Sequence, residues 1–588
     1  MAKTIDNEMG ENGICNIFAK KYESLYSSVS YNCTKLSLVE QKIVDGINTD
    51  CTLGKCYSRH KFSVDDGYNA IKELKVSKSD GRVKSMSNYI INATSKTVLY
   101  LSLLFNSIIS HGFVPSEMLL STLIPIPKNK RKSINNSSNY RGITLSSIIG
   151  KLLDIVVLKS NANVLKSSHL QFGFKEKHST SMCTFVLNEV AKYYNNKRSN
   201  VHCMLIDASQ AFDRVEYVKL FSLLVDKKVC PLILRFLLSL YTRQKLRVKW
   251  GNSFSTHFDI KNGVKQGGVL SPILFAMYMD ILLERLQRSG YGCHIGNVFV
   301  GAIAYADDIT LMAPTSTSLK LMLDTVNNFG MDYSVKFNPS KSMYIVLGNT
   351  EAQSYSLCFN NVIMQSVKSA MHLGHEIGSK ALGSNIQRNI RDCVKRFNLM
   401  MSVFKHCSRF VKYKLFKTYC MALYGSPMWD LSSAEVSKFY VTWRKCVKQL
   451  LNISPRAHGV YLHRIVNDLS IENQLIKRFL NFFNGIITSD NPVIRLCGSL
   501  VVNGSNSYAC RSLNFTRLKY NITCSKESKV HIPDVVRCMR SQDNEDIDAN
   551  DLLNISNIID LLYIREHNVD TYLDHNEINC LLNYFSIT

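Results

Sequence analysis

The chain reads Val300-Gly-Ala-Ile-Ala-Tyr-Ala-Asp307-Asp308-Ile-Thr-Leu-Met-Ala313, two apolar arms on either side of a pair of adjacent acids. Apolar arms of this length around a short polar break predict a tight β-hairpin with both acids at its tip. Two anions held side by side on a largely buried scaffold repel each other, and a cation would relieve that repulsion. The alternative interpretation is an ordinary turn, because Asp is common in turns.

A third acid ends another apolar run, Val201-His-Cys-Met-Leu-Ile-Asp207. Two strands that each deliver acid to one place are what a pair of Mg²⁺ ions needs for phosphoryl transfer, since Mg²⁺ prefers oxygen ligands. We therefore expect Asp207, Asp307 and Asp308 to meet in space as a catalytic, metal-binding set.

A glycine-rich segment, Gly263-Val-Lys-Gln266-Gly267-Gly-Val-Leu-Ser-Pro272, lies between these acids in the sequence. Its glycines allow a backbone to approach a ligand closely, and Ser-Pro suits the start of a helix. Without a ligand, the same pattern describes an ordinary strand-to-helix turn. Lys128 and Arg141 lie on turn-like segments and supply cations that could grip a triphosphate.

Composition narrows the class of protein. A chain of 588 residues is too long for one core, and 46% hydrophobic with 20% charged residues is typical of globular domains. The net charge of +25 predicts a polyanionic partner, nucleic acid first and an anionic membrane surface second. No apolar run reaches 18 residues and no signal peptide is recognisable, so we expect an intracellular protein without a membrane role.

The 18 cysteines show no framework spacing, which predicts free thiols in a reducing compartment. Four of them near the C-terminus are fairly regular but lack the close pairing that zinc knuckles need, so we expect no zinc site; they are Cys497, Cys510, Cys524 and Cys538.

Periodicity divides the chain into regions. Residues 1–60 are mixed and turn-rich, like a linker. A capped helix is predicted from Ser63, a second helix over 97–110 with a leucine-rich face, and a strand over 120–127. Strands and helices then alternate to about 350 without a βαβ repeat, which favours an α+β fold.

After residue 380 the pattern becomes helical and basic. The spacing predicts a buried stripe of Ile390, Val394, Phe397, Met401 and Phe404. The opposite faces carry Arg388, Arg391, Lys395, Arg396, Lys405, Arg409, Lys412, Lys414 and Lys417. A solvated face is the plain alternative, but in so basic a chain we favour a surface for phosphate backbones. An acidic stretch beyond 535 is assigned no function.

In this order the motifs resemble the reverse transcriptases of non-LTR, LINE-type (jockey-like) retrotransposons, over roughly residues 60–380 and more loosely to about 480. Eight segments carry the resemblance: Pro127-Lys128, Asn139-Tyr-Arg141, Gln171-Phe-Gly173-Phe, Asp207 to Phe212, Gln266-Gly267, Tyr305-Ala-Asp307-Asp308, Asn338-Pro-Ser-Lys341-Ser and His372-Leu373-Gly374. Each is weak or moderate alone, and the shared order makes the set specific.

The resemblance implies a right-hand polymerase. Residues 61–380 would form fingers and palm with an antiparallel palm sheet, 381–480 a basic helical thumb, and 481–588 a C-terminal region of unknown role. It also implies two Mg²⁺ ions, with Mn²⁺ as an alternative, on Asp207, Asp307 and Asp308. Lys341 would protonate the departing pyrophosphate, or is otherwise a plain exposed lysine.

Further roles are implied for the remaining motif residues. Nucleotide and template would be contacted by Lys128, Arg141, Phe212, Gln266, Gly267 and Tyr305, and the primer would be gripped at Leu373 and Gly374. Phe212 would exclude a ribose 2′-hydroxyl, or is otherwise a core side chain. Implied partners are an RNA template, a DNA primer, dNTPs, element RNA and host chromosomal DNA, with action in the nucleus after cytoplasmic synthesis.

The chain also departs from the family. Val76-Ser77 stands where relatives carry Pro-Gly, and Gly142 follows Arg141 where many carry proline. Residues 1–60 are too short for an endonuclease of the apurinic type, so we expect a chain that lacks this N-terminal domain. A catalytically dead nucleic-acid-binding remnant and a relative of group II intron maturases are the competing hypotheses, and three intact acids argue against the remnant.

Overall fold

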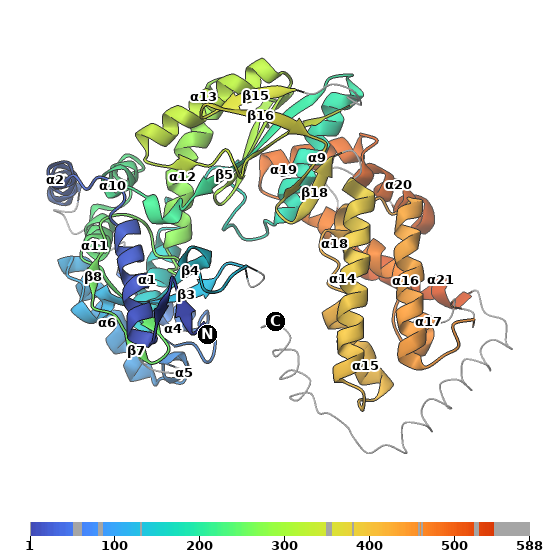
Figure 1. Cartoon of the computed structure of the whole chain (residues 1–588), viewed down its shortest axis with the longest axis horizontal. Helices are drawn as coiled ribbons and strands as arrows, with labels where there is room; N and C mark the ends of the chain where they lie inside the picture. The colour runs from blue at the N-terminus through green and yellow to red at the C-terminus, as the bar shows by residue number, and fades with distance from the viewer. Residues whose placement is uncertain are drawn as a thin grey trace.

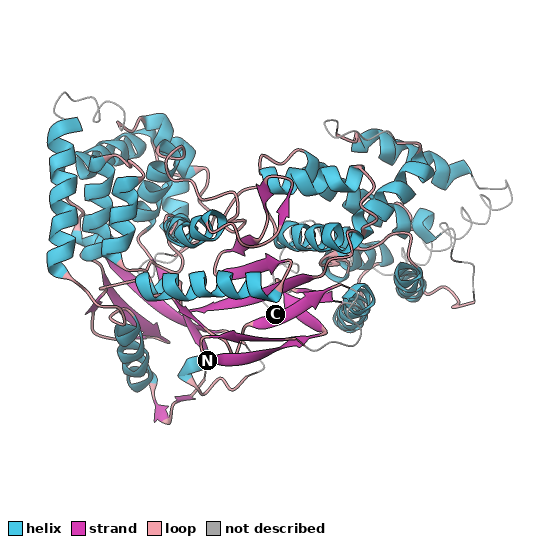
Figure 2. Ribbon diagram, turned by 90° about the horizontal axis from the view of Figure 1, so that it is seen from above, coloured by secondary structure: helices cyan, strands magenta, loops and turns pink. Residues whose placement is uncertain are grey.

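The computed structural model describes residues 2–50, 61–79, 86–129, 132–348, 355–378, 381–456, 459, 462–522 and 529–545, the side chains of 50 and 542–545 excepted. Figure 1 shows the N-terminal elements at one side, the elements after residue 380 at the other, and a sheet between them. Strands occupy the middle of the molecule and helices gather at either end (Figure 2).

The central sheet is built around one buried strand, β5. Its order is β11-β12-β5-β14-β16-β15, with β13 also paired to β5. The strands are β5 (Val201–Ser209), β11 (Ala302–Tyr305), β12 (Asp308–Ala313), β13 (Lys336–Phe337), β14 (Met343–Leu347), β15 (Ser356–Phe359) and β16 (Val362–Val367). Every pairing of β5 is antiparallel, as predicted for the palm sheet. One pair farther out, β14 and β16, runs parallel.

Three long helices pack against this sheet: α9 (Thr180–Asn196), α12 (Ser271–Arg288) and α13 (Ser316–Asp332). The helix start predicted at Ser271-Pro272 is confirmed, with proline in the first turn of α12. The apolar run that forms β5 is buried from Val201 to Ile206, because helices cover the sheet. The central sheet and these three helices, named the palm after the predicted architecture, support the side chains that emerge at the ends of β5 and β12.

A second sheet, β4-β3-β6-β7 with β8 beside β6, lies in the N-terminal part. Its strands are β3 (Leu120–Pro127), β4 (Tyr140–Leu145), β6 (Lys245–Trp250), β7 (Ser253–Phe254) and β8 (Phe258–Asp259). The helices around it are α4 (Val64–Ile71), α5 (Met86–Ile91), α6 (Ser95–His111), α7 (Ser116–Leu119), α8 (Ile148–Ser160), α10 (Tyr217–Asp226) and α11 (Pro231–Thr242). This part is named the fingers, after the architecture predicted from the sequence.

Several local predictions in the fingers are confirmed. Ser63 and Asp66 form a reciprocal capping box at the start of α4, and β3 has the predicted bounds. The predicted leucine-rich face of α6 was partly right. Its members Leu101 and Ile108 are buried, but Leu99, Leu103 and Leu104 are exposed, and Val98 and Phe105 take buried positions. The leucines of α6 lie on more than one side of the helix, whereas the buried residues follow the 3.6-residue period.

The N-terminal segment is helical, so its prediction as a turn-rich linker was wrong. It forms α1 (Glu11–Leu25) and α2 (Cys33–Asp50) after a short hairpin of β1 (Thr4–Ile5) and β2 (Glu8–Met9). Helix α1 buries Ile14, Phe18 and Tyr22 against β6, and α2 packs on α10 and α11. These three apolar residues are spaced by four, a stripe that the polar residues between them obscure.

Helices dominate after residue 380: α14 (Ala381–Val403), α15 (Arg409–Leu415), η3 (Phe416–Cys420), α16 (Ala434–Leu451), α17 (Leu462–Ile465), α18 (Ile471–Ile487), α19 (Pro492–Val502), α20 (Tyr508–Tyr520) and α21 (Ile532–Glu545). The predicted stripe of α14 was out of register. Phe397 and Phe404 are buried as expected, but Val394 is exposed, and Ile386, Cys393 and Met400 take the buried positions.

The C-terminal helices contact the palm through α9. Helix α19 packs on α9, the Phe185 and Phe482 rings meet edge to face at 5.9 Å, and Asn196 donates to the Ser505 carbonyl at 2.7 Å. The described part of residues 481–588 is therefore docked on the palm. From residue 546 onward the acidic stretch lies outside the described residues, as does Cys524.

Small elements complete the chain: β9 (His294–Ile295), β10 (Val298–Phe299), β17 (Ser369–His372), β18 (His375–Gly378), η1 (Ser137–Asn139), η2 (Phe212–Arg214) and η4 (Ser426–Met428). No helix within the described ranges combines the length and hydropathy of a membrane span. The cysteines of these ranges, Cys497, Cys510 and Cys538 among them, are free thiols.

Candidate active site

The predicted hairpin is confirmed. Tyr305 pairs with Asp308 across β11 and β12, which leaves Ala306 and Asp307 as a two-residue turn. On its other side Asp308 is the direct cross-strand partner of Asp207 on β5. Directly opposed residues in antiparallel strands have Cβ atoms about 5 Å apart. The sheet thus brings together three acids that lie a hundred positions apart in the sequence.

The three carboxylates act on one another electrostatically. Burial and the neighbouring carboxylates of Asp307 and Asp207 raise the pKa of Asp308 to about 6. Burial also raises the pKa of Asp307, with Asp207 adding to the rise and Arg141 and Lys341 opposing it. Like charges held this close disfavour ionisation of each other, so the protein stores repulsion that a bound cation would release.

Two predicted cations lie beside these acids. The Lys341 Nζ is 3.4 Å from Asp207 Oδ2, and its loop is fixed because Asn338 donates its backbone N–H to the Asp207 carbonyl at 3.0 Å. Arg141 is exposed on β4 of the fingers and lowers the pKa of Asp307. Fingers and palm therefore both direct positive charge at the carboxylates.

Lys128 belongs to the same electrostatic group. Burial lowers its pKa, and Arg141 and Lys341 lower it further. Its Nζ donates to the Ser138 carbonyl at 3.3 Å. Three cations that repel one another around an acidic site form a concentration of positive charge suited to a polyphosphate. Residues 130 and 131, just after Lys128, lie outside the described residues.

The three acids suit an open divalent-metal site. Within the described part of the chain, no three His, Cys, Asp or Glu side chains are gathered closely enough to hold an ion by themselves. Magnesium in polymerase sites is held by one or two carboxylates plus water and substrate phosphates, so a closed protein cage is not required. Asp207, Asp307 and Asp308 supply oxygen ligands and mutual repulsion, and they fit such an ion.

Gln266 and Gly267 lie against the fingers. Gln266 accepts the Thr144 backbone N–H at 2.8 Å with its carbonyl, and Gly267 has a φ of 115° with its Cα facing the Thr144 carbonyl, where a Cβ would come within 2.8 Å. Position 267 therefore favours glycine for two reasons, the positive φ and the close approach to the Thr144 carbonyl. The motif thus sits next to the strand that carries Arg141.

Asp213 was missed by the sequence interpretation. It is buried, and both its carboxylate oxygens accept from Gln266 Nε2 at 2.9 Å. Burial raises the pKa of Asp213 to about 6, which hydrogen bonds from Gln266 and Tyr26 and the charges of Lys128 and Arg141 oppose. Because the Gln266 Nε2 is bonded to Asp213, the side-chain orientation of Gln266 is fixed. Its only signal in the sequence is an acid directly after Phe212.

Phe212 is half-buried and stacked on Phe275, with ring centroids 4.0 Å apart, and it meets Phe174 edge to face at 5.8 Å. The contact with Phe275, a core residue of α12, shows that the ring is partly a packing element. Because the ring is also partly exposed, both predicted roles of Phe212, exclusion of a ribose 2′-hydroxyl and core packing, stay predictions.

The segment Gln171–Phe174, one of the eight that carry the family resemblance, is mostly internal. Gln171 and Phe172 are completely buried, and only Phe174 is exposed, at 42%. The side chains of Gln171 and Phe172 therefore have no exposed surface. Both residues instead hydrogen-bond to the backbone of the catalytic hairpin.

The predicted primer grip is the turn of the β17–β18 hairpin. Leu373 and Gly374 form it with φ values of 47° and 78°. The Tyr424 hydroxyl donates to the Leu373 carbonyl at 2.7 Å, and Arg388 donates to the Gly374 carbonyl at 2.7 Å. His372 contacts Thr310 of β12 through its Nε2 at 3.0 Å, so the turn is tied both to the catalytic hairpin and to the thumb.

Several predicted cations of the thumb are bonded to other groups of the protein. Arg388 and Arg396 donate to backbone carbonyls, and Lys417 pairs with Asp468 at 2.7 Å. Four others are exposed on α14, α15 and the loop between them: Arg391, Lys395, Lys405 and Lys414. The basic surface is real but smaller than the sequence suggested.

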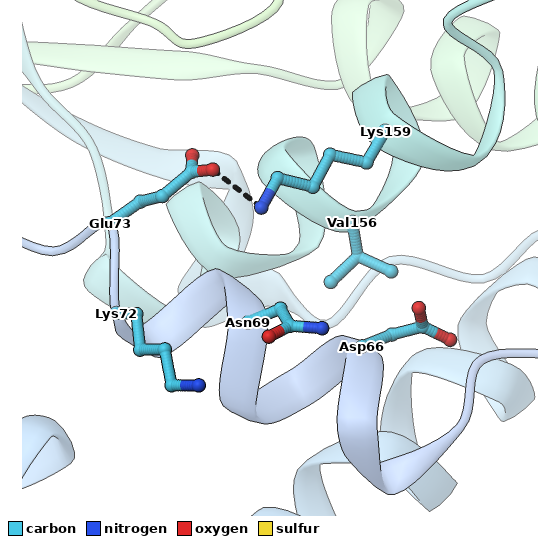
Figure 3. Close-up of a pocket in the computed structure, with 6 residues that line it drawn as sticks. All are labelled: Asp66, Asn69, Lys72, Glu73, Val156 and Lys159. Carbon is cyan, nitrogen blue, oxygen red and sulfur yellow. Dashed lines mark ion pairs between the residues drawn. The ribbon is translucent and has the colours of Figure 1, made fainter.

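A surface pocket of about 320 Å³ lies elsewhere, between α4 and α8 of the fingers (Figure 3). An ion pair of Lys159 and Glu73 at 2.5 Å crosses it. None of the predicted site residues lines it, so the carboxylate site is distinct from this pocket.

Comparison with known proteins identifies the module that contains the carboxylates. Residues 126–377 match the family model described as reverse transcriptase (RNA-dependent DNA polymerase). A probable RNA-directed DNA polymerase from transposon BS of Drosophila melanogaster is 23% identical over 482 residues, 78% of this chain and 52% of that protein. The RNA-directed DNA polymerase from mobile element jockey of Drosophila funebris is 24% identical, over 60% of this chain and 40% of that protein.

The chain spans about half or less of the length of these curated relatives. Among solved structures, apo telomerase from Candida tropicalis aligns with a TM-score of 0.33 and 14% identity, over 48% of this chain and 59% of that one, an overlap too small to assign a fold. The matched family is one whose chemistry depends on divalent metal and an RNA template. The chain carries a reverse transcriptase domain, and its sequence relatives are the polymerases of non-LTR, LINE-type retrotransposons.

Proposed function

We propose that the chain is an RNA-directed DNA polymerase that adds deoxynucleotides to a primer 3′-hydroxyl on an RNA template and serves retrotransposition. The observation that carries this is the register of β5 and β12, which opposes Asp207 and Asp308 with Asp307 in the adjoining turn. The cations of Arg141, Lys128 and Lys341 around these acids add support, because phosphoryl transfer is catalysed largely by positioning and charge stabilisation.

In this proposal Asp207, Asp307 and Asp308 hold two Mg²⁺ ions, with Mn²⁺ as a substitute. Such ions lower the pKa of an attacking hydroxyl and neutralise a leaving phosphate. The chain's own side chains do the rest: Lys128 and Arg141 orient the triphosphate, and Lys341 holds a proton within reach of Asp207 and the leaving group. Gln266, Gly267 and Tyr305 border the nucleotide, and the Leu373-Gly374 turn supports the primer.

The test is extension of oligo(dT) on poly(rA) with Mg²⁺ by the full chain, beside a variant carrying both Asp307→Asn and Asp308→Asn. We expect labelled products with the natural chain and none with the variant. Equal binding of primer-template by both, without extension by either, would instead identify a nucleic-acid-binding remnant.

The proposal extends to partners, location and domain limits. Element RNA and host chromosomal DNA would supply template and primer, which places the protein in the nucleus after synthesis in the cytoplasm. Fingers and palm would comprise 61–380, the thumb 381–480, and a C-terminal region of unknown role 481–588. A fluorescent fusion that stays cytoplasmic while elements transpose would contradict the nuclear assignment.

The replacement Phe212→Val is expected to raise incorporation of ribonucleotides relative to deoxyribonucleotides by about 10-fold or more, since removing a ring opens space for a 2′-hydroxyl. The measurement is the ratio of kcat/KM for each nucleotide in primer extension. Phe254→Val, which removes an exposed ring of the fingers, is the control. An unchanged ratio would assign Phe212 to packing against Phe275 alone.

The double replacement Arg391→Ala and Lys395→Ala is expected to weaken binding of primer-template while leaving kcat nearly unchanged, because both side chains are exposed on α14 and neither belongs to the carboxylate set. For each lost phosphate contact, the slope of log K against log salt concentration should become less steep by about 0.7–0.9. Binding titrations between 50 and 200 mM salt (roughly the range over which such contacts dominate) measure this. Lys438→Ala with Lys445→Ala on α16 is the matched control, and an equal effect of both pairs would point to net charge instead of a surface.

A further inference from the structure

One buried amide holds the turn that carries the catalytic acids. The Gln171 side chain is completely buried behind the β11–β12 hairpin. Its Oε1 accepts the backbone N–H of Ala306 at 2.9 Å, and its Nε2 donates to the Ala306 carbonyl at 3.2 Å. A single side chain therefore satisfies both backbone groups of the residue directly before Asp307.

Ala306 is a residue that needs such support. Its φ is 60°, a left-handed conformation that residues with a Cβ adopt only where the surroundings impose it. In a two-residue turn, rotation of the Ala306 peptide would redirect Asp307 and shift Asp308, the first residue of β12. The direction of both carboxylates thus depends on the Ala306 backbone.

Residues 170–173, here named the clasp, contact the hairpin over their whole length. Phe172 donates its N–H to the Ala304 carbonyl at 2.7 Å, and Ala304 donates to the Leu170 carbonyl at 2.9 Å. Gly173 donates its N–H to Gln171 Oε1 at 2.9 Å and lies so close to the turn that a Cβ would stand 2.4 Å from Ala306 N. Only glycine fits at that position.

The two residues that lead into the clasp, Ser168 and His169, are fixed by three hydrogen bonds. Asp280 of α12 accepts the Ser168 N–H at 2.7 Å, and Lys175 donates to the Ser168 carbonyl at 2.5 Å. Asn491, the residue that caps α19, donates to the His169 carbonyl at 2.7 Å. The palm and the C-terminal helices therefore both anchor the segment that grips the catalytic turn.

We propose that Gln171 is a positioning residue for catalysis: through the Ala306 peptide it aims Asp307 and Asp308 toward Asp207, so that divalent cation is held in the productive arrangement. The inference rests on the proposed polymerase function and deepens it. It separates Gln171 from the residues that touch nucleic acid, because its side chain has no exposed surface.

The main test is Gln171→Met, which keeps the side-chain length and removes the three hydrogen bonds. We expect kcat for primer extension to fall by about 10- to 100-fold, the magnitude that slight misplacement of reacting groups produces. The Mg²⁺ concentration for half-maximal rate should rise several-fold, while KM for dTTP and affinity for primer-template change by less than about 2-fold.

Two readouts do not depend on activity. Amide hydrogen exchange of peptides that cover residues 302–312 should become faster in Gln171→Met, with no change in peptides of the fingers. Binding of Mn²⁺ to the protein alone, followed by electron paramagnetic resonance, should weaken. If the natural chain extends no primer, the proposed function fails, and these two readouts still decide the role of Gln171.

Controls separate positioning from general loss of structure. Gln244→Met removes another buried glutamine, in the fingers, whose Nε2 has no hydrogen-bond partner in the described part of the chain, and should leave every readout unchanged. Gly173→Ala places a methyl group against the Ala306 backbone and so should displace the same turn. It should reproduce the loss of kcat and the higher Mg²⁺ requirement, and it serves as a second test if Gln171→Met folds poorly. Wild-type kcat, Mg²⁺ dependence and exchange rates in a folded Gln171→Met would overturn the proposal.

Discussion

Replacing Asp207 with asparagine is expected to lower kcat of primer extension by about 10³-fold or more. Coordinated metal ions contribute several kcal/mol of transition-state stabilisation, and each 1.36 kcal/mol is about tenfold in rate. Asp207 is the one acid of the set delivered by β5, opposite Asp308, so its loss leaves the proposed metal site open on that side. Single-turnover extension at saturating dTTP measures the effect.

The same variant gives a second, opposite readout. Because Asp207 helps to raise the pKa values of Asp307 and Asp308, removing its charge relieves repulsion in the metal-free protein. We expect its melting temperature without divalent cation to equal or exceed that of the natural chain. Added Mg²⁺ should stabilise the natural chain and not the variant.

Asp324→Asn, an exposed acid on α13 of the same module, is the control and should change neither rate nor melting. An active Asp207→Asn variant would remove the basis of the proposed mechanism. Loss of activity together with a large drop in melting temperature would instead assign Asp207 to folding.

Replacing Glu189 with glutamine is expected to stabilise the protein at alkaline pH. Glu189 lies on α9, is 1% exposed and accepts from the Ser505 hydroxyl at 3.1 Å. Burial raises its pKa from 4.5 to about 7, against hydrogen bonds from Ser507 and Ser505. Between these values the folded state binds more protons than the unfolded state, so stability falls as the pH rises through that window.

A rise of this size corresponds to roughly 3 kcal/mol at pH 8, of which the neutral glutamine should recover on the order of 1–3 kcal/mol. Urea denaturation at pH 5 and pH 8 tests this: the natural chain should lose stability between the two, and Glu189→Gln should lose much less. Glu435→Gln, a surface residue of α16 that pairs with Lys438, is the control. Parallel pH profiles for natural chain and Glu189→Gln would show that Glu189 is not the titrating group.

Short-range pattern was enough for many parts of the molecule. The hairpin around Asp307, the capping box at Ser63, the strand at Leu120–Pro127 and the start of α12 all follow from residues within about ten positions of one another. Alternation, capping and the fixed φ of proline act locally, so they are visible in one dimension. Where polar residues interrupted the period, as in α1, the same approach failed.

The chemistry of the site was likewise readable from residue types, since adjacent acids, a distant third acid and nearby cations are an uncommon combination. Residue types alone did not show which basic side chains are bonded within the protein. Arg388, Arg396 and Lys417 were expected to face phosphates and are engaged within the protein, and the buried stripe of α14 is shifted around the helix. A helix of mixed pattern can rotate until its neighbours decide which face is covered.

Local sequence alone specified the acids and the hairpin that carries them. Tertiary contacts alone specified the opposition of Asp207 to Asp308, the grip of Gln171 on Ala306 and the pairing of Asp213 with Gln266. Apart from local turns, these contacts join segments that are about 50 to 135 positions apart. Such partners are chosen by the packing of strands and helices in three dimensions, and no periodicity within a segment encodes them.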